Sequence, residues 1–369
     1  MKKASRREFL VGGLGLSVAG ALTACGVKSS GSSSTATPPV SFGPPSPVAA
    51  APGQHIVDVS LIAHQNTVDL GSGVIARTWG YGDTVPGKVL RANAGDFIRA
   101  NVLNELEADT TIHWHGVHIR NPADGVPGVT QDPIAPGKSF VYEFTAPNPG
   151  THFFHPHVGV QLDRGLYAPL VIDDPKERGD YDDEWIVVLD DWTDGIGQSP
   201  DDILAGYQAQ HGSLSGMGGG SMSGMPGMGG GSMSGMPGMG GGSRSALGDA
   251  GDIAYPHYLI NGRVPTAPVS FSSKPGNRIR IRMINAGSDT VFKVALGGHQ
   301  MSVTHSDGYA VAPRSTGALY IAMGERYDVV VTAGDGVFPL VAAPVGKPGQ
   351  ALAPLRTASG PAPAATVRP

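Results

Sequence analysis

Short apolar runs separated by turn-forming residues are the feature that most constrains how this chain can fold. The runs at 56–61, 96–102, 139–144 and 169–172 are rich in β-branched and aromatic residues, with Gly, Pro, Asn and Asp between them. The 55 Gly and 31 Pro among 369 residues disfavour long helices. Short strands at regular spacing with turn signals predict a β-sandwich or barrel. We therefore expect an all-β fold.

A second set of such runs indicates a second domain of the same kind. These runs lie at 185–189, 257–260, 278–283, 291–296 and 327–331. In 278–283, arginines occupy the even positions and apolar residues the odd ones, so we expect one solvated and one packed face. The chain is long enough for two domains with real cores. We predict two β-sandwiches, over 53–178 and 179–349, and a disordered tail over 350–369.

Two His-x-His pairs predict a metal site. His113 and His115 precede His155 and His157 by 42 positions (155 − 113). Side chains alternate along a strand, so the histidines of each pair face the same side, roughly 6.5 Å apart. Four imidazoles without carboxylates suit copper, zinc or iron better than magnesium or calcium. Either pair alone could be a surface pair or stacked core residues; two pairs in aromatic, strand-like surroundings favour a transition-metal site.

The N-terminus carries the features of an export signal. The paired Arg6 and Arg7 precede an apolar, glycine-rich run over 9–24, too short for a comfortable membrane span. The run resembles a twin-arginine signal and ends in a sequence that resembles a lipoprotein box, with Cys25 as the residue to be lipidated. The alternative is an incidental cysteine in a cleavage region. Residues 1–25 are the predicted signal, and the Ser/Pro/Thr/Ala-rich residues 26–52 are a predicted flexible tether.

A methionine repeat interrupts the second predicted domain. Within the insertion at 212–245, an 11-residue unit recurs (228 − 217 = 239 − 228), and its glycine content excludes a helix. The insertion holds seven of the chain's 11 Met: Met217, Met222, Met225, Met228, Met233, Met236 and Met239. Thioethers are soft ligands that select Cu(I), so the repeat favours copper; neutral drift of a Gly-Met repeat is the alternative.

Several runs together resemble the multicopper oxidases. Those similar to the family's first cupredoxin domain are His113-Trp114-His115-Gly116, Asp124-Gly125-Val126-Pro127-Gly128, Gly150-Thr151-His152-Phe153-Phe154-His155-Pro156-His157 and Gly165-Leu166-Tyr167-Ala168-Pro169-Leu170. Those similar to its second domain are Asn261-Gly262-Arg263, Arg280-Ile281-Arg282-Met283-Ile284-Asn285-Ala286-Gly287, Asp307-Gly308 and Gly324-Glu325-Arg326-Tyr327-Asp328. The match covers most of 53–345 and implies two cupredoxin-like Greek-key sandwiches.

The resemblance also implies a role for each site residue. By similarity, His113 would bind the type 2 copper, and His115, His155 and His157 the type 3 pair, in a cluster that reduces O2 to water. Asp124 matches a carboxylate that orients water and helps move protons; the alternative is a simple turn residue in Asp-Gly. His118 and His152 fall outside the ligand positions, and we expect them to lie behind the ligands or on the surface.

The sequence departs from the family where a third domain would supply further ligands. It has no His after His305, and its only Cys is Cys25, so the type 1 copper ligands are absent and the oxygen-reducing cluster is half present. We expect an exported oxidase fragment that acts on Cu(I) or phenols in copper resistance, its missing domain supplied by another chain. A copper-buffering lipoprotein without turnover and a structural cupredoxin pair are alternatives. The protein is expected in the periplasm or at the cell surface, anchored through Cys25, and the net charge of −5 argues against nucleic acid as a partner.

Overall fold

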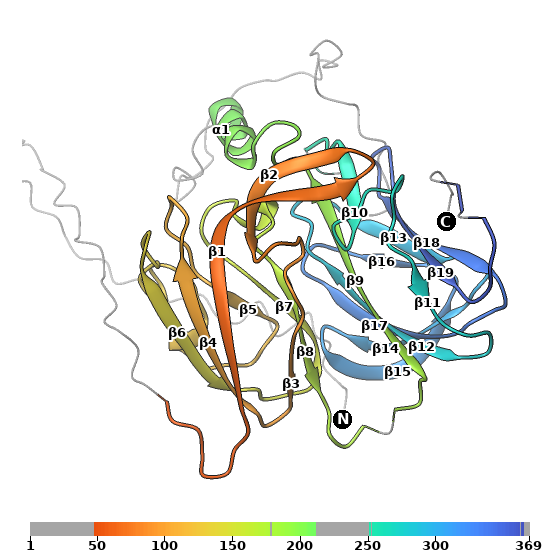
Figure 1. Cartoon of the computed structure of the whole chain (residues 1–369), viewed down its shortest axis with the longest axis horizontal. Coiled ribbons are helices and arrows are strands. Elements are labelled where there is room, and N and C mark those ends of the chain that lie inside the picture. Colours follow the sequence, from red (N-terminus) through yellow and green to blue (C-terminus); the bar gives the residue numbers. More distant parts are fainter. Residues whose placement is uncertain (1–47, 178, 212–250, 252, 362, 365–369) are drawn as a thin grey trace, which may run out of the picture. The chain divides into compact units, whose positions relative to one another are not determined.

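The computed structural model of the chain describes residues 48–177, 179–211, 251, 253–361 and 363–364 (Figure 1). They all belong to one compact unit, Val40–Pro369. The predicted signal with Cys25, the tether before residue 48 and the methionine insertion at 212–245 lie outside the described residues. In the described part, strands dominate and none of the helices is long and apolar enough to cross a membrane. The predicted all-β fold is confirmed.

Two four-stranded sheets form the N-terminal sandwich, which we define as strands β1 to β8. One sheet has the order β2 (Val74–Tyr81), β1 (Ile56–Gly71), β4 (Phe97–Asn104), β6 (Ser139–Thr145). The other has the order β3 (Leu90–Asn93), β8 (Ala168–Asp173), β7 (Gly150–His155), β5 (His113–His115). Both sheets contribute to one core, in which Trp114 and Phe154 are fully buried. This core holds β5 and β7 in place side by side.

The C-terminal sandwich, strands β9 to β19, follows the same plan with larger sheets. Its first sheet has the order β10 (His257–Ile260), β9 (Asp183–Trp192), β12 (Arg278–Asn285), β17 (Arg326–Thr332), β14 (Met301–Ser306), β15 (Tyr309–Thr316). Its second has the order β11 (Phe271–Ser272), β19 (Ala351–Arg356), β18 (Val337–Pro344), β13 (Phe292–Leu296), β16 (Leu319–Ile321). Apolar side chains from both sheets, among them Ile281, Phe292 and Leu340, make its core.

A third apolar cluster joins the two sandwiches. It combines Phe153 and Tyr167 of the N-terminal sandwich with Val188, Trp192 and Ile284 of the C-terminal one, all nearly inaccessible to solvent. Fully burying one such side chain contributes about 1.5–3 kcal/mol. The β7 strand that carries Phe153 is therefore packed against the C-terminal sandwich as well as its own.

The face of β12 that carries the arginines is buried, so the prediction of a solvated face was wrong. Their alternation with apolar residues predicted a solvated face, but Arg280 is 3% and Arg282 1% exposed. Both guanidinium groups pair with Asp328, and Arg282 also pairs with Glu184. The alternation thus separates an apolar core face from a buried face of ion pairs, which a two-state hydrophobic pattern does not distinguish.

The expected disordered tail also needs correction. Residues Ala351–Arg356 form β19, whose first five residues are buried, paired along β18 over six positions. Its Ala-Leu-Ala-Pro-Leu composition resembles a linker, yet β18 pairs with the whole strand and the core accepts its small apolar side chains. The boundaries predicted for the two domains stay predictions. Helical structure in the described part of the chain is limited to α1 (Pro200–His211) and two 3-10 turns, η1 (Asn121–Ala123) and η2 (Leu162–Arg164).

Candidate metal centre

The pairing of β5 with β7 brings the two histidine pairs together. The strands are antiparallel, with His113 opposite His155 and His115 opposite Phe153. Because side chains alternate along a strand, the residues between them, Trp114 and Phe154, point into the core of the N-terminal sandwich instead. The aromatic residues therefore anchor the strands from one face while the imidazoles project from the other.

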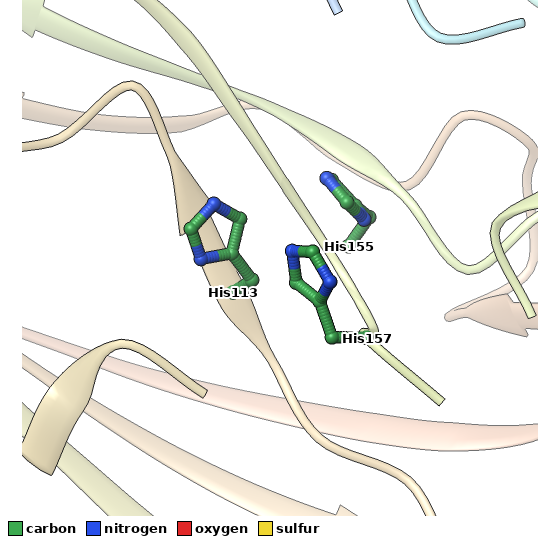
Figure 2. Close-up of side chains that lie close together, drawn as sticks. All are labelled: His113, His155 and His157. Atoms are coloured by element: carbon green, nitrogen blue, oxygen red, sulfur yellow. The ribbon is translucent and has the colours of Figure 1, made fainter. Parts of the chain in front are cut away.

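Three of the four histidines form a compact cluster (Figure 2). One ring nitrogen from each of His113, His155 and His157 lies within 4.8 Å of the others. The rings of His113 and His157 are 4.5 Å apart between centroids and nearly perpendicular. His115 is outside this group, but its Nδ1 is 3.1 Å from Nε2 of His155. The structure thus brings all four predicted ligands together, three of them around one point.

The surroundings lower the pKa of three of the four imidazoles, those of His115, His155 and His157. Burial, with the positive charge of Arg326, lowers the pKa of His115 to about 2. Burial also lowers the pKa of His155 to about 3, and burial with neighbouring His113 lowers that of His157. A neutral imidazole keeps one nitrogen lone pair free for a metal, whereas a protonated one has none.

Hydrogen bonds determine which ring nitrogen carries the lone pair in His113 and His155. His113 Nδ1 donates to the main-chain oxygen of Asp124 at 2.8 Å and lies 3.2 Å from its carboxylate. His155 Nδ1 donates to the carbonyl of Pro156 at 2.9 Å. With both Nδ1 atoms donating, each ring carries its lone pair on Nε2, which on His155 also lies 3.1 Å from Nδ1 of His115. Outer partners orient metal-binding histidines in this way.

A glycine lets the loop with Asp124 approach His113. Gly125 has φ +78°, and a Cβ at this position would lie 1.9 Å from the carbonyl oxygen of Ile112. No residue with a side chain fits there without moving the backbone of the strand that leads to His113. The Asp-Gly pair is thus a turn as well as the source of the carboxylate, so both predicted roles of Asp124 are compatible with its position.

The donor set fits copper. Neutral imidazoles suit copper, zinc and iron, and the cluster found among the described residues includes no carboxylate that would favour magnesium or calcium. The seven methionines of the repeat and Cys25, which would add softer ligands, lie outside the described residues. His118 is exposed, and His152 is fully buried behind the ligands, where burial lowers its pKa to about 4.

The run 324–328 lies against the histidine cluster, although the sequence alone assigned it no role in the site. A Cβ on Gly324 would be 2.9 Å from Cε1 of His115, and the buried Arg326 bonds to the main chain of Thr151 on β7. The run contributed only to the family resemblance. Nothing in its composition indicates contact with a histidine some 200 residues earlier, so only the packing of the two sandwiches identifies it.

Comparison with protein families gives two matches along the chain. Residues 63–177 match one multicopper oxidase family model, and residues 183–359 match a second one. The first match contains the four histidines of the two His-x-His pairs, and the second contains the run 324–328. Together the matches span nearly all of the described residues.

Individual relatives agree with this. The multicopper oxidase MmcO of Mycobacterium tuberculosis (strain ATCC 25618 / H37Rv) is 46% identical, over 100% of this chain and 69% of its own length. Copper resistance protein A of Escherichia coli is 31% identical, over 97% of this chain and 57% of its own. The laccase from Botrytis aclada superposes with a TM-score of 0.65 at 25% identity, over 85% of this chain and 56% of its own. The sandwiches are thus cupredoxin-like, as predicted, and this chain spans 69% or less of the lengths of these relatives.

Proposed function

We propose that this chain, which belongs to the multicopper oxidase family, binds copper through His113, His115, His155 and His157 and contributes to the oxidation of Cu(I) or phenolic compounds by O2. Enzymes of the family are copper-dependent oxidoreductases with O2 as the electron acceptor. The observation that carries the assignment of the site is the cluster of ring nitrogens from His113 on β5 and from His155 and His157 at the end of β7.

Each residue of the site has a distinct part in this proposal. Bound copper would supply one-electron redox chemistry for the reduction of O2. His115 and His155 would hold it without first losing a proton, since burial already lowers their pKa values. Asp124, whose side chain is 34% exposed, would fix the His113 ring and hold a proton between solvent and the site.

The role in copper resistance and the cellular location are also proposals. A relative named copper resistance protein A supports the first, and the methionine repeat at 217–239 would deliver Cu(I). The paired Arg6 and Arg7 before an apolar run support export by the twin-arginine route, with Cys25 as the anchor on the periplasmic or outer face of a membrane.

A copper-buffering role is the second candidate, and the cysteine content favours it. Cys25 is the only cysteine of the sequence, so residues 26–369 contain no thiolate for a type 1 copper. If no thiolate is supplied from outside residues 26–369, the four histidines and seven repeat methionines would store copper without turnover. Binding and oxidation must therefore be measured separately.

Titration of the full chain with Cu(II) tests the site. We expect the double variant His113→Ala/His155→Ala to bind the first copper at least about 100-fold more weakly, because it loses two of the clustered donors. The matched control is His64→Ala/His118→Ala, which removes two histidines that do not belong to the cluster and should leave the affinity unchanged. Equal binding by both double variants would refute the assignment.

Oxygen consumption by the copper-loaded chain separates the two functions. An oxidase should consume O2 when supplied with Cu(I) or a phenol, and the His113→Ala/His155→Ala variant should not. Tightly bound copper without O2 consumption, with and without a coexpressed chain that provides a Cys-containing cupredoxin domain, would favour buffering.

A further inference from the structure

The turn between β16 and β17 makes close contact with His115. Gly324 in this turn has φ +77°, and a Cβ built on it would lie 2.9 Å from Cε1 and 3.2 Å from Nε2 of His115. The first distance is too short for a Cβ contact and the second is tight, so the imidazole occupies the space that any side chain at 324 would need. The contact comes from the C-terminal sandwich, whereas the histidine belongs to the N-terminal one.

Phe153 holds the same ring from another direction. Its ring stacks on that of His115 with centroids 4.4 Å apart and an angle of 25° between the planes. Gly324 is itself fixed, because its N–H donates to the carbonyl of Asn285 at 2.9 Å. The turn is closed by Glu325, whose carboxylate accepts from the N–H of Ala322 at 2.6 Å. The His115 ring therefore lies between a buried aromatic ring and a rigid turn.

Arg326 ties this turn to the strand of the metal centre. Its side chain is 4% exposed and donates to the carbonyl of Thr151 on β7 at 3.2 Å and to that of Gly324 at 2.9 Å. A Cβ on Gly116, the residue after His115, would lie 2.1 Å from Nη2 of Arg326. Gly116 of the N-terminal sandwich thus faces the guanidinium group of Arg326, and Gly324 of the C-terminal sandwich faces the ring of His115.

We infer that Gly324 and Arg326 are positioning residues for the copper site: they set the orientation of the His115 imidazole and make one ligand of the site depend on the C-terminal sandwich. The inference rests on the proposed function, since it concerns a histidine assigned to copper. Without the turn, the His115 ring would keep its stacking on Phe153 and the contact of its Nδ1 with His155, but would lose its support on the side of Gly324. A ligand that must be ordered on binding costs affinity.

The substitution Gly324→Ala tests this inference. The added methyl group should displace the His115 ring, lower the Cu(II) affinity of the full chain at least about tenfold and change the EPR spectrum of the bound Cu(II). The matched control is Gly276→Ala. Gly276 has φ +85°, and a Cβ added there would meet no atom within 4 Å, so it shares the backbone strain without the contact. The control should therefore lose only the thermal stability that the backbone strain costs, and keep the parent's affinity and spectrum.

A second variant keeps the test decisive if Gly324→Ala does not fold. Arg326→Lys adds no atom beside His115 but removes the paired donation to Thr151 and Gly324, and should alter the EPR spectrum in the same direction with a smaller loss of affinity. Arg314→Lys, on the exposed strand β15, is its control. Parent-like affinity and spectrum in the folded variants would overturn the inference. Copper binding by the parent that survives His113→Ala/His155→Ala would instead refute the proposed function.

Discussion

Two clusters of basic side chains, one in each sandwich, accommodate their charge in different ways. On β5 and the end of β7, His113, His155 and His157 lie together without a carboxylate in their group. On β12, Arg280 and Arg282 are buried against Asp328. An imidazole can shed its proton when burial makes charge costly, whereas a guanidinium group cannot and must be paired. The histidine cluster is consequently free to take up a metal ion, and the arginine cluster is fully engaged.

The two clusters are connected through Thr151 on β7. Its hydroxyl donates to Asp328 at 2.5 Å and accepts from Arg282 Nη1 at 3.0 Å. The same strand ends at His155, four residues later. The arginine cluster therefore contributes to holding the strand that carries the metal centre, which gives it a structural role that the histidines do not share.

The largest effect should come from removing the carboxylate at the centre of the arginine cluster. Asp328→Ala leaves two buried guanidinium groups short of a partner, and breaking such a pair costs about 3–5 kcal/mol. Asp58→Ala is the control, because Asp58 pairs with Arg99 while 60% exposed and should cost no more than about 1 kcal/mol. Urea unfolding measures both. Equal losses of unfolding free energy would show that the pairing with Asp328 does not compensate the buried charges of Arg280 and Arg282.

Burial should also favour the neutral form of a carboxyl group. For a carboxyl group this means that the pKa is raised, whereas the pKa values of the buried histidines are lowered. Burial and the nearby Asp191 raise the pKa of Asp163 to about 7. Because this folded-state pKa lies above the ordinary value of 3.8, the folded state holds the proton more tightly. The stabilisation is complete below about pH 4 and is lost as pH rises through about 7.

The corresponding measurement compares the parent with Asp163→Asn at pH 5 and pH 8. Between these values the parent should lose about 2 kcal/mol more of its free energy of unfolding than the variant, which carries no titrating group at 163. If the two proteins have parallel pH profiles, the proton on Asp163 does not contribute to stability.

The smallest predicted effect concerns the contact between Asp124 and His113. Asp124→Asn keeps the main-chain oxygen that accepts from Nδ1 of His113 and removes only the charge 3.2 Å away. We expect about a tenfold loss of Cu(II) affinity, at the lower end for outer partners of metal ligands, with unfolding unchanged. Asp132→Asn, in the same connection between β5 and β6, serves as the control. Unaltered affinity in Asp124→Asn would assign to Asp124 only its part in the turn.

The sequence predicted the histidine side of this comparison better than the arginine side. The two-residue spacing of His113 and His115 has one meaning in a strand, so the grouping of the histidines and the all-β fold followed from local patterns. The burial of Arg282 depends on Asp328, 46 positions away, and on strand pairing that no local pattern specifies. The contact of Gly324 with His115 depends on the packing of one sandwich against the other. Strand β19 was missed because its Ala/Pro composition is also that of a linker.

Pulsed EPR of the full chain loaded with one equivalent of Cu(II) tests the central claim most directly, because it detects the imidazole nitrogens around the bound ion. The account predicts coupling to at least two imidazoles in the parent and in His64→Ala/His118→Ala, and its loss in His113→Ala/His155→Ala. Imidazole coupling that persists unchanged in His113→Ala/His155→Ala, or none in the parent, would contradict it.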